Sequence, residues 1–278
     1  MTTTATAGKT EELLQRLTVG VETLTSSEEW VRYLDVQGRF HHYSFGNVLL
    51  ISLQFPDATR VAGFRKWLEL GRHVQRGQKG IAILAPVVHR LKVEDEVTGE
   101  ERTIVSTPRA FRVVYVFDVS QTEGDDLPES PARRLEGDSV AGAYEDLAAY
   151  AGRLGFSVEV SDDLTGQVNG DCTHTLHRIR VRAGLSPAQS TKTLAHEMAH
   201  AILHGGDIES RERAELEAES VAYIVCGLLG VDSADYSFGY LAGWGGGEDA
   251  IKRIRESGHR IQQTAQQVIG ALDIALDR

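Results

Sequence analysis

Apolar residues in the first half of the chain recur at helical spacing and then at strand spacing. Apolar side chains three and four residues apart are typical of amphipathic helices, and Pro56 ends the last of three such segments. A short helix is expected at Phe64–Leu70, and Thr98 and Gly99 form a turn signal further along. The pattern predicts helices at about 10–24, 27–37 and 45–54, and strands at Ile81–Leu84, Val87–Val93, Thr103–Ser106 and Phe111–Val119.

The stretch 126–138 contains two of the six prolines, carries clustered charges and shows no periodicity. We interpret it as a linker between a domain at 1–125 and a domain at 139–278. The expected fold class is α+β, with an N-terminal α+β domain and a C-terminal domain that is mainly helical with a small sheet. The second domain is predicted to contain a helix at about 139–154, strands at about 156–160 and Thr173–Arg182, and helices at Pro187–His204, Arg211–Tyr223 and about 248–275.

The helix predicted at Pro187–His204 has clear start and stop signals. Ser186 is a capping residue, Pro187 suits the first helical position, and Gln189 completes the N-terminal signature. Gly205 follows the last turn, as glycine commonly does at the end of a helix. These signals make a helix the expected setting for the motif inside this segment.

That motif is His196-Glu197-Met198-Ala199-His200. Residues four apart lie one above the other on a helix, so both imidazoles can reach one ion while Glu197 holds a water molecule. Catalytic zinc takes three protein ligands and leaves a fourth position for water. The motif therefore predicts Zn²⁺ as cofactor and a metallopeptidase helix, with an ordinary surface helix that carries two histidines as the alternative.

Glu215 is the carboxylate that we expect to complete the zinc site. It lies within about 60° of the centre of the apolar stripe of its helix, whereas Glu217 and Glu219 lie about 100° to either side of that centre. Glu219, one turn later, could accept a hydrogen bond from a ligand imidazole. Glu217 is interpreted as a solvent-facing residue, which is also the alternative for Glu215 and Glu219.

His204 continues the histidine series on one side of the helix and is a second candidate for the third ligand. A straight helix places its ring about 12 Å along the axis from that of His196, which is too far for a shared ion. We therefore rank Glu215 above it. His204 is expected to contact a ligand imidazole from behind, or to form a polar helix end.

Peptide hydrolysis is the reaction that such a site would support. A zinc ion would lower the pKa of a water molecule and polarise an amide carbonyl, while Glu197 would take a proton and return it to the leaving amine. The segment Thr173–Arg182 could pair with an extended peptide, although an ordinary strand at the core edge is an equal interpretation. Tyr240 is a candidate to stabilise the oxyanion, although it and its neighbours Tyr236 and Trp244 could equally be packing residues.

The composition is that of a globular protein, with 278 residues of which 41% are hydrophobic. No apolar run approaches the 18 or so residues that would span a bilayer, and the first residues lack the charged and apolar regions of a signal peptide. Cys172 and Cys226 have no metal-binding spacing, which fits a reducing compartment. We expect a cytoplasmic protein without a membrane partner.

Positive charge is concentrated in one region of an otherwise acidic chain. The net charge is -11, yet residues 30–92 hold ten lysine or arginine residues and three acidic ones. Aromatic rings stack on unpaired bases and cations track phosphates, so the combination suits single-stranded nucleic acid, although rings at helical spacing are also typical of a core. The candidates for DNA contact are Trp30, Arg39, Tyr43, Phe45, Asn47, Arg65, Trp67, Arg72 and Lys79.

Most of residues 10–122 resembles the N-terminal domain of ArdC-type antirestriction proteins. The resemblance implies sequence-independent binding of single-stranded DNA, and a role with mobile genetic elements in the protection of incoming DNA. The residues that carry it are Trp30, Tyr33, Leu34, Tyr43–Ile51, Gln54, Pro56, Ala58, Thr59, Gly63, Phe64, Trp67, Gly77–Ile81 and Val114–Thr122.

The second half is similar to the zinc metallopeptidase domains of the ImmA and IrrE group, in a zincin-like fold. The similarity rests on the motif from His196 to His200 and on Glu215, Ala218, Glu219, Val221 and Ala222. It implies that His196, His200 and Glu215 are metal ligands. This chain has Glu219 where ImmA-like sequences often have asparagine.

Three hypotheses remain open at this point. The first is a protein that binds single-stranded DNA and cleaves an unknown protein or peptide substrate. The second is a DNA-binding protective protein whose zinc is structural. The third is a regulatory peptidase whose N-terminal domain binds protein.

Overall fold

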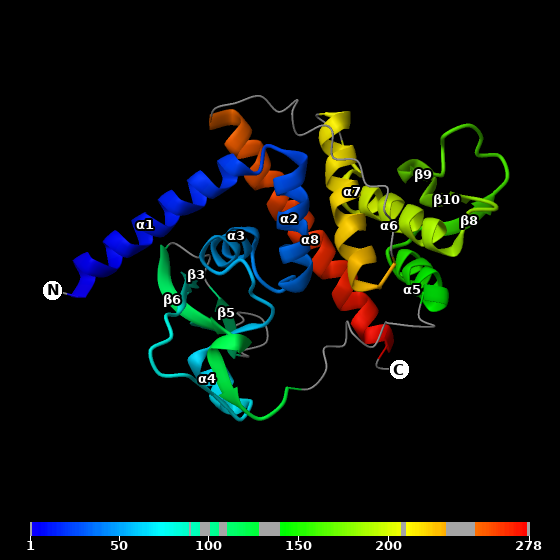
Figure 1. The fold of residues 1–278 in the computed structure, drawn as a ribbon. Coiled ribbons are helices and arrows are strands. Elements are labelled where there is room, and N and C mark those ends of the chain that lie inside the picture. The colour runs from blue at the N-terminus through cyan, green and yellow to red at the C-terminus, as the bar shows by residue number, and fades with distance from the viewer. Residues whose placement is uncertain are drawn as a thin grey trace. The chain divides into compact units, whose positions relative to one another are not determined.

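The computed structural model describes residues 2–88, 90–94, 101–105, 110–127, 140–206, 210–231 and 248–276 (Figure 1). Contacts divide the chain into two compact units. Unit 1 comprises Met1–Gly20 and Leu49–Asp126, and unit 2 comprises Val21–Val48 and Leu127–Arg278. Each unit is thus built from two separate stretches of the chain. Most of the linker expected at 126–138 lies outside the described residues.

Unit 1 is built around a three-stranded antiparallel sheet with the order β1-β6-β3. Leu84 on β3 lies opposite Val113 on β6, and Leu84 packs with Leu13 and Leu50 in the core of this unit. Its described elements are α1 (Thr2–Thr23, up to Gly20), α3 (Phe45–Gln54, from Leu49), α4 (Phe64–Glu69), β1 (Val61–Gly63), β2 (Arg72–Val74), β3 (Ile81–Val87), β4 (Arg90–Glu94), β5 (Glu101–Val105), β6 (Ala110–Asp118), η1 (Val119–Gln121) and β7 (Thr122–Gly124).

The end of β6 is fixed by the buried carboxylate of Asp118. This side chain accepts backbone hydrogen bonds from Thr59 at 2.7 Å and from Arg60 at 3.0 Å. It also caps η1, because it accepts from the backbone of Ser120 while the side chain of Gln121 accepts from the backbone of Asp118. The loop before β1 is thereby tied to the strand with which β1 pairs.

Unit 2 combines long helices with a small sheet of the order β8-β10-β9. The central strand β10 runs parallel to β8 and antiparallel to β9, and its Ile179 and Val181 are buried. The described elements are α2 (Ser27–Arg39), α5 (Val140–Arg153), β8 (Ser157–Ser161), β9 (Gly170–Thr173), η3 (His174–Leu176), β10 (Arg178–Arg182), α6 (Pro187–Leu203), α7 (Arg211–Leu228) and α8 (Glu248–Leu276).

The prediction of one strand over Thr173–Arg182 is wrong. The chain turns back within this segment, so that β9 and β10 form an antiparallel pair in which Cys172 lies opposite Ile179. The turn consists of η3 and His177, whose φ of 46° lies in the left-handed region. A non-glycine residue rarely adopts this conformation, which is why the alternating sequence gave no sign of the turn.

Helix α2 packs within unit 2, against α7. The indole nitrogen of the fully buried Trp30 donates to the hydroxyl of Ser220 at 2.9 Å. The hydroxyl of Tyr223 donates to the carboxylate of Asp35 at 2.6 Å. Because α2 precedes unit 1's sheet in the sequence, a segment from the first part of the chain supports a helix from its second part.

The predicted α+β class is confirmed, and so is the helix after Ser186. The first helix begins at Thr2, earlier than the expected residue 10. The short strands β1, β2, β7 and β9 were not predicted, since three or four residues show too little periodicity. Among the described residues, no helix is both long and apolar enough to cross a membrane.

Candidate metal centre

Helix α6 presents the motif histidines to a cleft because its other face is buried. Ser186 accepts a hydrogen bond from the backbone of Gln189 at 3.3 Å and so fixes where the helix begins. Leu194 and Met198 have no exposed surface and anchor the helix in the core. The helix is therefore held rigidly at both its start and its buried face.

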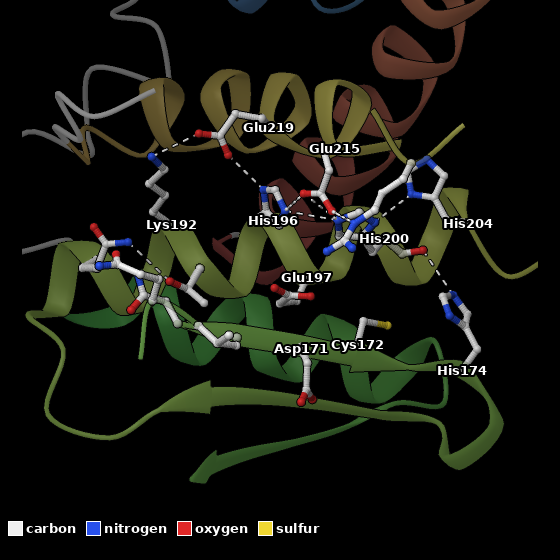
Figure 2. Close-up of a pocket in the computed structure, with 17 residues that line it drawn as sticks. Asp171, Cys172, His174, Lys192, His196, Glu197, His200, His204, Glu215 and Glu219 are labelled. Atoms are coloured by element: carbon white, nitrogen blue, oxygen red, sulfur yellow. Dashed lines mark hydrogen bonds and ion pairs between the residues drawn. The ribbon is translucent and has the colours of Figure 1, made fainter. Parts of the chain in front are cut away.

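Two helices bring three ligand atoms together, as Figure 2 shows. One nitrogen each of His196 and His200 on α6 and one carboxylate oxygen of Glu215 on α7 lie within 4.8 Å of one another. The Nε2 atoms of the two histidines are 3.1 Å apart, and Oε2 of Glu215 lies 3.4 Å from that of His196 and 3.7 Å from that of His200. Two imidazole nitrogens and a carboxylate oxygen that converge in this way form a donor set suited to a divalent metal.

Glu219 lies behind His196, where sequence reasoning placed it. Its Oε2 atom is 2.9 Å from Nδ1 of His196, and its Oε1 atom is 3.2 Å from Nζ of the buried Lys192. Burial disfavours ionisation of Glu219, but its bonds to His196 and the charge of Lys192 outweigh this and lower its pKa. An ionised Glu219 accepts the Nδ1 proton of His196 and so leaves Nε2 directed toward the cleft.

The expectation that Glu217 faces solvent is wrong, because its side chain is only 1% exposed. Its Oε2 atom lies 3.1 Å from Nε2 of His204, and Nδ1 of His204 lies 3.0 Å from Nδ1 of His200. His204 therefore contacts His200 from behind, one of the two roles that the sequence left open. The helical position alone gave no sign that α8 covers Glu217.

Glu197 projects from α6 toward β9 and is 8% exposed (Figure 2). Burial is the largest cause that raises the pKa of its carboxyl group to about 7. The charge of His196 lowers this pKa, and the charges of Glu215 and Asp171 raise it. A carboxylate with a pKa near neutral pH is suited to accept and return a proton.

The cluster lines an open cleft of about 620 Å³. Part of its wall is the edge strand β9, which lies beside α6 and contributes Gly170, Asp171 and Cys172 to the lining. Burial and the charges of Glu197 and Asp171 raise the pKa of the Cys172 thiol to about 12, so it is not a nucleophile at neutral pH. Sequence reasoning missed this wall because β9 is only four residues long.

Tyr240, expected to stabilise the oxyanion, lies outside the described residues, as do Tyr236 and Trp244. The structure thus assigns them no place. Within the described part of the cleft, the lining also includes the exposed Arg211 and the polar residues Gln167, Asn169 and Gln189.

The residues expected to contact DNA are divided between the two units. Trp30, Phe45 and Trp67 are at most 4% exposed, and the indole nitrogen of Trp67 donates to the backbone of Phe117. These three rings pack in cores, so they are not available to stack on bases in this structure. Arg72 holds β2 to β7 through bonds to Thr122.

The other expected DNA contacts differ in exposure. Arg39 in unit 2 and Arg65 and Lys79 in unit 1 are exposed, whereas Tyr43 and Asn47 in unit 2 are half-buried. Exposed aromatic rings of unit 1 occur elsewhere, at Phe64, Phe111 and Tyr115. These rings were not in the expected set.

Two protein families match this chain. Residues 7–117 match the N-terminal domain of the anti-restriction factor ArdC, and residues 151–226 match the IrrE N-terminal-like domain. Two separate parts of the chain are thus similar to an ArdC N-terminal domain and to an IrrE N-terminal-like domain. The second match includes the histidine motif of α6 and the glutamates of α7.

Individual proteins that are similar to this chain share low sequence identity with it. An uncharacterized protein from Bacillus anthracis is 26% identical over 307 residues, which cover 95% of this chain and 51% of that protein. The chain thus spans about half the length of that curated relative. A metal-free crystal structure of the antirestriction ArdC protein from the R388 plasmid is 22% identical, with a TM-score of 0.47 and coverage of 83% of both chains. Its Mn(II)-bound structure is 20% identical, with a TM-score of 0.46 and coverage of 86% of this chain and 97% of that one.

Proposed function

We propose that this protein is a zinc-dependent metallopeptidase that also binds single-stranded DNA, and that it acts in antirestriction. The observation that carries the peptidase proposal is the convergence of His196, His200 and Glu215 at an open cleft beside Glu197. Structural zinc sites are closed by four protein ligands, whereas catalytic sites have three and remain open. The described residues supply three ligands and an open cleft.

The residues of the cleft have distinct tasks in this proposal. Bound zinc would supply a Lewis acid that activates water and polarises a carbonyl. Glu197 accepts a proton from the water and passes it to the amine of the leaving peptide. Glu219 holds His196 in the orientation that directs Nε2 into the cleft.

The edge strand β9 offers a binding surface for an extended peptide. It pairs with β10 on one side and ends the sheet on the other, where the cleft lies. Backbone groups at a sheet edge can pair with an added strand, while side chains beside it select the sequence. We therefore propose that the substrate binds in extended form along β9.

A Glu197→Gln variant tests the peptidase proposal. Purified full-length wild type and variant, each loaded with zinc, are incubated with a proteome-derived peptide library, and new termini are identified by mass spectrometry. Wild type should cleave, and the variant should keep wild-type zinc content and thermal stability but lose cleavage. Zinc-dependent stability without cleavage by the wild type would instead support a structural zinc in a DNA-binding protective protein.

The DNA-binding proposal is supported by exposed rings and cations on unit 1. Phe64 and Tyr115 are 51% and 46% exposed. Arg65 is exposed and follows Phe64 in the sequence. Lys79 is exposed and precedes Gly80, which lies close to the side chain of Tyr115. Stacking of an exposed ring on a base contributes about 1–3 kcal/mol. We propose that these residues, rather than the buried tryptophans, contact the bases and phosphates.

Fluorescence anisotropy with the full-length chain tests this proposal. A labelled single strand of mixed sequence should bind, duplex should compete poorly, and affinity should fall as salt rises. Phe64→Ala and Tyr115→Ala should each weaken binding about 5- to 150-fold, as expected from the loss of one stack. Leu68→Ala, which removes a similarly exposed apolar side chain of α4, is the matched control. No binding at low salt would favour a regulatory peptidase whose N-terminal domain binds protein.

A further inference from the structure

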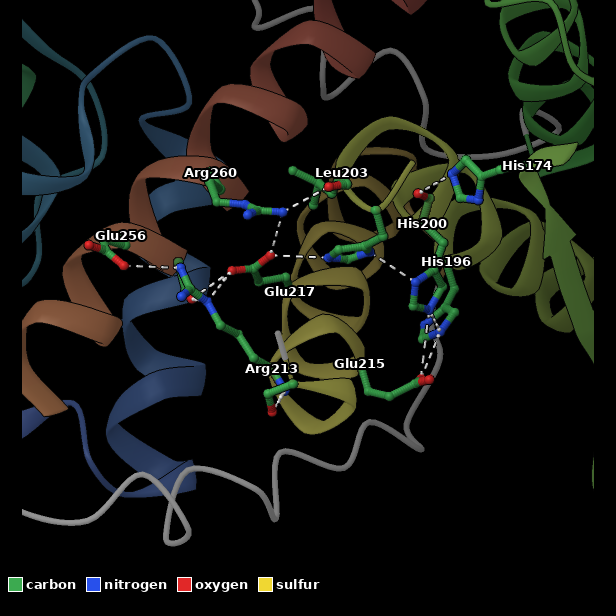
Figure 3. Close-up of polar contacts among 12 residues, drawn as sticks. His174, His196, His200, Leu203, Arg213, Glu215, Glu217, Glu256 and Arg260 are labelled. Atoms are coloured by element: carbon green, nitrogen blue, oxygen red, sulfur yellow. Dashed lines mark hydrogen bonds and ion pairs between the residues drawn. The ribbon is translucent and has the colours of Figure 1, made fainter. Parts of the chain in front are cut away.

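A buried chain of polar groups extends from the ligand His200 to helix α8 (Figure 3). Nδ1 of His200 lies 3.0 Å from Nδ1 of His204, and Nε2 of His204 lies 3.1 Å from the carboxylate of Glu217. The side chains of His204 and Glu217 are 5% and 1% exposed. Water in the cleft therefore cannot replace these hydrogen bonds without a rearrangement.

Glu217 is held as an acceptor by donors on two helices. Its Oε1 atom accepts from the hydroxyl of Ser257 at 2.6 Å and from Nε of Arg213 at 3.0 Å. Its Oε2 atom lies 3.2 Å from the guanidinium of Arg260 and 3.1 Å from His204. Both carboxylate oxygens therefore face donors, a hydroxyl and two guanidinium groups among them, which are the surroundings of an acceptor and not of a donor.

An ionised carboxylate only accepts hydrogen bonds, so Nε2 of His204 must carry the proton in its contact with Glu217. In neutral histidine the other nitrogen is then an acceptor. Nδ1 of His204 can thus accept a hydrogen bond from Nδ1–H of His200. With that proton on Nδ1, the lone pair of His200 lies on Nε2, the atom that faces Glu215 and His196.

We propose that Glu217, acting through His204, is a positioning residue that selects the metal-binding tautomer of His200. This inference rests on the proposed metal centre. Glu219 selects the corresponding tautomer of His196 by direct contact, whereas Glu217 acts on His200 through the imidazole of His204. The two ligand histidines are therefore oriented by two separate carboxylates of α7.

The end of α6 is held in the position that this relay requires. Arg260 donates to the backbone carbonyl of Leu203 at 2.8 Å, and Nε2 of His174 lies 3.1 Å from the carbonyl of His200 (Figure 3). Arg260 thus contacts both Glu217 and the residue that precedes His204. These contacts fix the backbone on either side of the relay.

Zinc affinity of the full-length protein is the first test, measured by competition with a chromophoric chelator. His204→Phe keeps a planar ring but removes both nitrogens, and it should weaken zinc binding about 10- to 100-fold. His204→Gln should restore affinity close to wild type, because one amide can accept from His200 and donate to Glu217. His259→Phe, at an exposed histidine of α8, is the matched control and should bind as wild type. Thermal unfolding without metal shows whether each variant is folded.

Wild-type affinity in a folded His204→Phe variant would overturn the inference while leaving the metal centre intact. Absence of zinc binding by the wild type would overturn the metal centre and this inference with it. Because the readout is metal affinity, neither result depends on whether a peptide substrate has been found.

Nitrogen NMR of the histidine-labelled wild type is a second test that requires no buried substitution. Long-range proton–nitrogen spectra distinguish the two tautomers, and the His204→Gln spectrum assigns the signals. The expected result is a proton on Nε2 of His204 and on Nδ1 of His200. A neutral His204 with its proton on Nδ1 would overturn the inference, since His200 could then only accept.

Discussion

The position of Glu197 depends on the absence of a side chain at Gly170. A Cβ atom there would lie 2.9 Å from Cγ of Glu197, 2.6 Å from Thr193 and 3.0 Å from the backbone oxygen of Arg180. Real Cβ atoms do not approach other atoms this closely. Residue 170 therefore allows the edge strand and the proposed general base to lie next to each other.

We expect Gly170→Ala to lower the rate of peptide cleavage about 100-fold, because a small displacement of a catalytic group has a large effect. Zinc affinity should change little, since Gly170 does not contact the three ligand atoms. Steady-state kinetics and chelator competition measure the two effects. Gly152→Ala, at a helical position where a Cβ meets nothing within 4 Å, is the control. An unchanged rate in Gly170→Ala would show that Glu197 does not need its present position.

Asp118 should make unit 1 sensitive to acid. Burial raises its pKa, but hydrogen bonds from Ser120, Thr59 and Arg60 outweigh this and lower the pKa below its usual value. The stabilising effect is present above the unfolded pKa of about 3.9 and is lost as pH falls through the lower folded pKa. Asp118→Asn should cost about 1–3 kcal/mol at pH 7 by leaving donors without their charged acceptor.

The measurement is urea unfolding between pH 7 and pH 3, followed by the fluorescence of Trp67 in a background with phenylalanine at positions 30 and 244. Asp118→Asn should show a smaller loss of stability on acidification than wild type. Asp57→Asn alters an exposed carboxylate nearby and should behave as wild type. Equal acid sensitivity of wild type and Asp118→Asn would contradict the assignment.

Single residues were predictable from the sequence where one helix determines their position. His196 and His200 are four residues apart on a capped helix, so their convergence follows from helix geometry. The burial of Glu217 and Glu219 was not predictable in this way, because the two residues lie at nearly equal angles on either side of the apolar stripe of α7. Only the packing of α6 on one flank of α7 and of α8 on the other determines their partners.

At the scale of elements, long helices were predictable and short strands were not. The capped helix α6 was expected to end at about His204 and ends at Leu203. The β9–β10 hairpin was read as one strand because the turn lacks glycine, proline or asparagine, and His177 adopts the left-handed conformation without them. The cleft wall was missed for that reason.

Substitutions of Trp30 test whether α2 stabilises α7, the helix that carries Glu215. Trp30→Phe removes the hydrogen bond to Ser220 and should lower the stability of unit 2 by about 1 kcal/mol, whereas Trp30→Ala should cost about 3–5 kcal/mol. Thermal unfolding of the zinc-loaded protein measures both changes. Trp67→Phe is the matched control, because it removes an equivalent bond to Phe117 in unit 1. In that control, the unfolding temperature of unit 2 should remain at its wild-type value. A lowered unfolding temperature of unit 2 in Trp67→Phe would argue against separate cores.

At the scale of the whole molecule, nothing in the sequence indicated that an early segment belongs to the second unit. Prolines, charges and the lack of periodicity indicated a linker at 126–138, but the contacts also assign Val21–Val48 to unit 2. Aromatic residues of this segment, such as Trp30 and Phe45, were interpreted as DNA contacts because of their positive surroundings. Their burial depends on α7 and on α8, where Gly258 leaves room for the ring of Phe45.

Metal removal should affect the two units differently. Zinc at 100 times its dissociation constant stabilises the state that binds it by about 2.7 kcal/mol, and the three ligands all belong to unit 2. A chelator should therefore lower the unfolding temperature reported by Trp30 in a variant with phenylalanine at positions 67 and 244. It should leave unchanged the transition reported by Trp67 in a variant with phenylalanine at positions 30 and 244. Equal shifts in both variants would show that the units unfold together.

The location of α2 has a consequence for how such proteins are inherited. The ArdC match at 7–117 includes α2, yet α2 covers α7 of the unit that holds the metal ligands. A recombination event with its junction near residue 127 could join the second half to a first half without an indole at this position, which would leave the hydroxyl of Ser220 without this donor. Substitutions at Trp30 and Ser220 should therefore be found together among related sequences.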